Sequence, residues 1–196
     1  PLMPIDKNFL SQVAIRVAQP SNDAPSGVAA SILTVAAGSY GFRSAPQDEI
    51  TMPTGFDPSA AALFESIVET AYLVATADGV FDEAERKAFQ DVVLEACRGT
   101  VNPDQLEALL ADLADQVEED GIDQRVAMVA RTIQRPEHQR EVLRIAALLA
   151  LVSGTVTDAE RHVIDKLVAA FGLDGGVSET VLAEAARILT DAAPKS

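Results

Sequence analysis

Two stretches of this chain repeat each other, and this internal repeat restricts the possible fold more than any other feature. When residues 67–93 are laid over residues 142–168, the apolar positions stay in register. Identical pairs include Ala71/Ala146, Gly79/Gly154 and Glu85/Glu160. Each copy has the pattern of a helical hairpin, with a helix, a glycine-containing turn and a capped second helix. Because neither hairpin can bury its apolar face alone, we expect the two to pack together about a pseudo-twofold axis.

Helix start signals recur along the rest of the chain, and no segment has the alternation of a strand. Asp57-Pro58 and Asn102-Pro103 are N-caps with proline at the first helical position. The sequence therefore predicts an all-α fold. We expect a compact bundle of about seven helices built from the two pseudo-symmetric hairpins, with Ser178 as the N-cap of the last helix.

The first 56 residues precede the repeat and are expected to form an N-terminal extension that is partly helical and partly extended. A helix is predicted over residues 5–19, and the apolar stretch at residues 28–37 favours a second helix over a strand. Residues 38–55 collect glycine and proline, which predicts a linker or a lid over the core. We therefore divide the chain into residues 1–56, a candidate docking segment, and a helical domain of residues 57–196.

The chain is strongly acidic, with a formal net charge of −15 and a pI near 4.4. Such a charge repels nucleic acid and anionic lipid, and it attracts cations and basic protein partners. Cys97 is the single cysteine, which excludes an internal disulfide and suits the cytoplasm. No run of 18 apolar residues is present, so no membrane-spanning helix is expected.

The turn of the first hairpin carries carboxylates at Asp78, Asp82 and Glu85. Asp82 and Glu85 have the spacing of an N-cap and its partner three residues later, and the second copy has an equivalent pair. Asp78 is not explained by capping. It lies at the C-terminal end of a helix, where the macrodipole disfavours an anion, and the second copy has Ser153 instead.

The charge of Asp78 is expected to be neutralised either by Arg86 or Lys87 or by a bound cation. Oxygen ligands with no histidine or thiolate nearby select calcium or magnesium over zinc. The spacing is not that of an EF-hand, which needs acids at alternate positions and a glycine at the sixth. We therefore predict a weak, hydrated calcium or magnesium site at Asp78, Asp82 and Glu85.

A second acidic group follows between residues 112 and 123. Its members are Asp112, Asp115, Glu118, Glu119, Asp120 and Asp123. The simplest interpretation is a solvated helix surface. The alternatives are a contact for a basic partner segment or a second cation site.

No catalytic group of residues accompanies these acids. His138 and His162 have no cysteine or second histidine at ligand spacing, and Cys97 falls on the apolar face of its helix. The glycine-containing residues 172–176 follow no strand and precede no lysine, so they do not form a phosphate loop. We expect no enzymatic activity and no cofactor apart from the cation.

The sequence Ala77-Asp78-Gly79, followed by a short acidic turn and Glu85 on a helix, resembles the TerB-like family, named for a bacterial tellurite-resistance protein. The resemblance covers about residues 57–192 and leaves out residues 1–56. It implies a compact bundle of around seven helices without enzymatic activity. It also implies a role in stress responses to tellurite and other toxic oxyanions, with acidic clusters that bind divalent cations. A related domain belongs to a membrane-bound DnaJ-type co-chaperone.

These observations predict a non-enzymatic cytoplasmic interaction module that responds to a divalent cation. We expect protein partners of basic or membrane-associated character, in stress-response or envelope-associated complexes, and no nucleic acid. The alternative is a structural adaptor or cargo-like subunit that docks through residues 1–56 and binds no metal.

Overall fold

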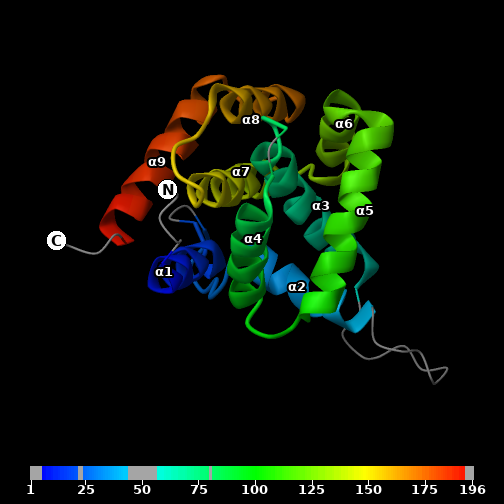
Figure 1. Ribbon diagram of the computed structural model, residues 1–196, viewed down its shortest axis with the longest axis vertical. Coiled ribbons are helices and arrows are strands. Elements are labelled where there is room, and N and C mark those ends of the chain that lie inside the picture. The colour runs from blue at the N-terminus through cyan, green and yellow to red at the C-terminus, as the bar shows by residue number, and fades with distance from the viewer. Residues whose placement is uncertain (1–5, 22–23, 44–56, 80, 193–196) are drawn as a thin grey trace.

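A computed structural model of the protein describes residues 6–21, 24–43, 57–79 and 81–192 (Figure 1). Within these ranges the chain forms nine helices and no strand, which confirms the all-α class. The helices are α1 (Lys7–Ala18), α2 (Ile32–Arg43), α3 (Pro58–Ala75), α4 (Glu83–Ala96), α5 (Pro103–Asp120), α6 (Ile122–Thr132), α7 (Pro136–Leu151), α8 (Asp158–Ala170) and α9 (Gly176–Ala192). The finer expectations, a count of about seven helices and a pseudo-twofold relation between hairpins, stay predictions.

Helix α7 forms the centre of the molecule. Every residue from position 141 to position 150 is buried, because this part of the helix is apolar on nearly all sides. α7 packs against α1, α2, α3, α8 and α9. α5 and α6 lie at one side of the molecule, and α1 and α9 lie at the other (Figure 1).

The helix starts follow local capping chemistry. The side chains of Asp57, Asp82, Asn102 and Thr157 each accept a hydrogen bond from a backbone N–H in the first turn, as predicted. The prediction for the last helix was wrong. α9 begins two residues before Ser178, and Oδ1 of Asp174 accepts a hydrogen bond from the Gly176 N–H at 2.8 Å. The side chain of Ser178 is buried and does not act as the N-cap.

The second helix of the N-terminal region is longer at its C-terminal end than the sequence suggested. Residues 38–43, predicted as linker or lid, continue α2, because this part of the helix packs on the core. The Tyr40 ring stacks on Phe64 with centroids 4.6 Å apart. A Cβ atom at Gly41 would collide with the carbonyl oxygen of Thr100, so glycine here permits close helix packing. Residues 44–55 of the predicted linker lie outside the described residues.

Helices α1 and α2 belong to the same hydrophobic core as the rest of the chain. Val13, Val17 and Leu33 are essentially inaccessible to solvent and join one continuous cluster with the side chains of α3 to α9. The division of the chain at residue 57 remains a prediction, but the described part of residues 1–56 packs on the bundle.

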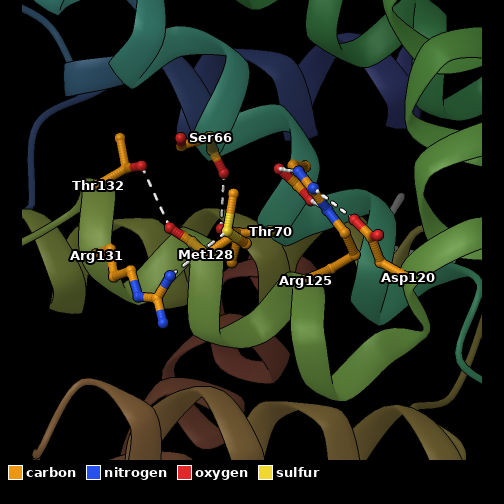
Figure 2. A network of polar contacts seen from close by, with 8 residues as sticks. Ser66, Thr70, Asp120, Arg125, Met128, Arg131 and Thr132 are labelled. Atoms are coloured by element: carbon orange, nitrogen blue, oxygen red, sulfur yellow. Dashed lines mark hydrogen bonds and ion pairs between the residues drawn. The ribbon is translucent and has the colours of Figure 1, made fainter.

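A buried ion pair joins α6 to α3. The guanidinium of Arg125 contacts Glu69 through Nε–Oε1 at 2.6 Å and Nη2–Oε2 at 3.0 Å, and both side chains are nearly inaccessible. Its Nη1 also donates to Asp120 at 3.0 Å, and Figure 2 shows these two side chains pointing toward each other. The two-point geometry of this ion pair fixes the position of α6 after the chain reverses at Gly121.

Candidate functional site

The first acidic turn begins where α3 ends. Oγ1 of Thr76 donates to the Tyr72 carbonyl at 2.8 Å, and Gly79 has a φ of 79°, which closes the turn. The ring of Phe81 lies edge-on to Tyr72 and to Phe89, which anchors the turn to both helices of the hairpin. Asp78 is exposed on this turn.

Asp82 and Glu85 form the predicted capping box. Oδ1 of Asp82 accepts from the Glu85 N–H at 2.8 Å, and Oε2 of Glu85 accepts from the Asp82 N–H at 3.2 Å. One oxygen of each carboxylate therefore serves to start α4.

The second turn repeats this chemistry in a more buried setting. Oε2 of Glu160 accepts from the Thr157 N–H at 3.0 Å, and Oγ1 of Thr157 accepts from the Glu160 N–H at 3.2 Å. Ser153, which takes the place of Asp78, donates from Oγ to the Ala150 carbonyl. Glu160 is only 4% exposed, whereas Glu85 is half-buried.

The two turns meet in the folded chain. Glu85 of the first hairpin and Ser153 of the second line a common cavity of about 20 Å³, which is the space of a single water molecule. Burial raises the pKa of the Glu160 carboxyl, and the negative charges of Asp78 and Glu85 raise it further. Asp78, Glu85 and Glu160 therefore influence one another electrostatically across the two turns, and we call these three residues the inter-turn acidic cluster.

The sequence prediction found two members of this cluster and missed the third. Asp82 was predicted with Asp78 and Glu85, but the charges that raise the pKa of Glu160 are those of Asp78 and Glu85. Glu160 was interpreted as a capping residue, which it is. The signal for its second role was the identity of Glu85 and Glu160 in the repeat, together with the expectation that the hairpins pack together.

In the parts of the chain that are described, no three histidine, cysteine, aspartate or glutamate side chains form a group that could hold a metal ion. The oxygen chemistry of Asp78, Asp82 and Glu85 is that of a calcium or magnesium ligand set. The site at these three residues remains a prediction.

The second acidic group divides into paired and solvated members. Asp120 contacts Arg125, and Oδ1 of Asp123 lies 2.6 Å from Nζ of Lys166, which lowers the pKa of Asp123. Asp112, Asp115, Glu118 and Glu119 are exposed on α5. The four exposed residues form the solvated helix surface that the sequence suggested. Asp120 and Asp123 instead form ion pairs with residues of α6 and α8.

The remaining reactive side chain is in the core. Cys97 is fully buried, and burial raises the pKa of its thiol to about 12. A thiol in this environment is not a nucleophile at neutral pH.

The fold and these turns define a class of protein. It is an all-α domain in which two capped turns carry carboxylates that influence one another electrostatically. The chain belongs to the tellurite resistance protein TerB family, whose sequence model matches residues 65–183, more than half of the chain. The resemblance inferred from the Ala-Asp-Gly turn is thereby confirmed. No curated protein and no solved structure matches the chain. None of the described helices is long and apolar enough to span a membrane.

Proposed function

We propose that this protein is a non-enzymatic, cytoplasmic TerB-like interaction module, and that the inter-turn acidic cluster is its functional surface. The observation that carries the proposal is that Glu85 and Ser153 of the two turns line one small cavity, and that the charges of Asp78 and Glu85 act on Glu160. Helix capping accounts for Glu85 and Glu160 individually, but it does not require Asp78 beside them.

A positive charge is the natural ligand of this surface. The carboxylates repel one another, and their effect on the pKa of Glu160 is the electrostatic signature of that repulsion. A calcium or magnesium ion at Asp78, Asp82 and Glu85 would relieve it, and so would a basic side chain of a protein partner. Asp78 is exposed to solvent. We propose that cation binding regulates partner binding in a bacterial response to tellurite or in an envelope-associated complex.

Titration calorimetry with calcium and with magnesium tests the cation step. The wild type is expected to bind in the range of about 0.1–1 mM, as exposed and hydrated calcium sites do. Asp78→Asn should weaken binding by about tenfold or more, because it removes a charged ligand while keeping the shape of the side chain. Asp112→Asn on α5 is the matched control and should bind like the wild type. Absence of heat with the wild type, or equal affinity in Asp78→Asn, would contradict the proposal.

A structural adaptor is the second candidate, and one observation favours it. Ile15 is 47% exposed on α1 and offers an apolar contact for a partner on the N-terminal region. Deleting residues 1–56 would remove core side chains such as Val13 and Val17, so surface variants are the better test. Ile15→Glu should abolish assembly with a partner if docking occurs here, whereas Asp78→Asn should abolish it if the acidic cluster is the functional surface.

A further inference from the structure

A large cavity among the described residues lies away from the inter-turn acidic cluster. It has a volume of about 1150 Å³ and is lined by residues between positions 21 and 36, the start of α3, the first half of α7 and one face of α9. This volume is that of a site for an organic ligand. No residue of the acidic turns lines it, so its function is independent of the proposed cation site.

The charge of the cavity is opposite in sign to that of the protein. Its lining includes four arginines and three glutamates. The four are among only fifteen basic residues in a chain with a net charge of −15. The lining therefore has a small net positive charge, whereas the molecule as a whole repels anions.

Two of these arginines form no ion pair with a carboxylate of the described residues. Nη2 of Arg135 lies 2.7 Å from Oε1 of Glu137, and Nη2 of Arg144 lies 3.8 Å from Oε1 of Glu141. In contrast, neither Arg140 nor Arg187 forms an ion pair with another described residue, and both are exposed at the edge of the cavity. Their guanidinium groups are free to bind an anionic head group.

The inner wall of the cavity contains a further polar group without a partner. Arg144 is 5% exposed and donates from Nη1 to the Arg16 carbonyl at 3.1 Å and from Nη2 to the Gln19 carbonyl at 2.8 Å. Its Nε has no hydrogen-bond partner among the described residues. A buried donor without an acceptor is costly, so the cavity wall here favours an acceptor atom.

Another part of the lining is apolar and partly open to solvent. Val28 and Val35 are 44% and 67% exposed, and they are two of the four large apolar side chains that the described surface exposes. Both line the cavity, together with Leu63 and Val181. Exposed apolar side chains grouped in a cavity mark a binding surface for an apolar ligand.

We propose that this cavity binds a single-chain amphipathic anion, an aliphatic chain with a carboxylate head group. The head group would bind Arg140 and Arg187 at the edge, and the chain would cover Val28 and Val35. A short carboxylate lacks the aliphatic chain, and a cationic amphiphile lacks the negative charge of the head group. The cavity should therefore bind both more weakly.

Titration calorimetry with decanoate, below the concentration at which it forms micelles, tests this proposal directly. We expect one saturable site for decanoate, and binding at least about tenfold weaker for butanoate and for decyltrimethylammonium. If decyltrimethylammonium bound as tightly as decanoate, or if decanoate did not bind, the proposal would be overturned.

Variants locate the site. Val35→Glu and Arg187→Gln both change exposed residues, and each should weaken decanoate binding by about tenfold. Ile15→Glu and Arg131→Gln make the same chemical changes outside the cavity and should bind decanoate like the wild type. Circular dichroism melts verify that each variant is folded. Should Val35→Glu fail to fold, Arg187→Gln decides alone. Unchanged affinity in the folded cavity variants would contradict the assignment.

Discussion

At the scale of single residues, Glu160 is the most informative side chain. It caps α8, it is nearly inaccessible to solvent, and it lies in the field of two further carboxylates. Burial and the nearby negative charges both disfavour the ionised form of this side chain. Its cap can be kept without the charge, because an amide oxygen accepts the same hydrogen bond.

Glu160→Gln should therefore make the protein more stable at neutral pH. The pKa of Glu160 is raised in the folded state. The contribution of Glu160 to folding stability is therefore fully present at pH values below its usual pKa near 4.5, and it is lost as the pH rises through the folded pKa. The variant should have the higher Tm at pH 7, and the difference should disappear near pH 4. Glu107→Gln, an exposed change on α5, should show no such difference. A Tm at pH 7 equal to or below that of the wild type would refute this account of Glu160.

Cys97 should be unreactive in the folded protein. With a thiol pKa of about 12 and no exposed surface, it should not react with a disulfide reagent at pH 8. In guanidinium chloride one thiol per chain should react within minutes. Rapid reaction of the native protein, measured by absorbance of the released thiolate, would show that the residue is accessible.

At the scale of helices, the packing of α2 and α6 depends on features that are specific to single positions. α2 approaches the loop before α5 so closely that Gly41 has no room for a side chain. Nε2 of Gln105 also donates to the Gly41 carbonyl at 3.2 Å. α6 depends instead on the ion pair between Arg125 and Glu69.

Gly41→Ala and Gly38→Ala should change stability in opposite directions. At Gly41 the new methyl group collides with a backbone carbonyl, which should cost about 1–3 kcal/mol through displacement of α2. At Gly38 nothing lies within 4 Å of the new methyl group, and alanine should stabilise the helix by up to about 1 kcal/mol. Urea unfolding of both variants measures the difference. Equal stabilities would show that α2 does not pack as described.

Removing one partner of the buried ion pair should be strongly destabilising. Arg125→Met leaves Glu69 buried without its partner and should cost about 3–5 kcal/mol. The double variant Glu69→Leu/Arg125→Met removes both charges and should recover most of that loss. If the double variant were as unstable as Arg125→Met, loss of the ion pair would not explain the destabilisation.

At the scale of the whole molecule, the sequence predicted what local chemistry determines. Caps such as Asp82 and Thr157 depend on a few neighbouring residues, and the structure confirms them. The continuation of α2 to Arg43 was missed because it depends on contacts of Tyr40 and Gly41 with segments that are distant in the sequence. The burial of Glu160 was missed for the same reason, since it depends on packing between α8 and helices that are distant in the sequence, such as α3.

The central claim is that the two hairpins bring carboxylates together to hold a positive charge. A crystal structure grown in millimolar calcium and inspected at Asp78 is the most direct test. The account predicts an ordered ion bound by oxygens of Asp78, Asp82 and Glu85, at distances of about 2.3–2.6 Å, and no ion in Asp78→Asn. No ion at Asp78 in the wild type, or an ion that persists in Asp78→Asn, would contradict it.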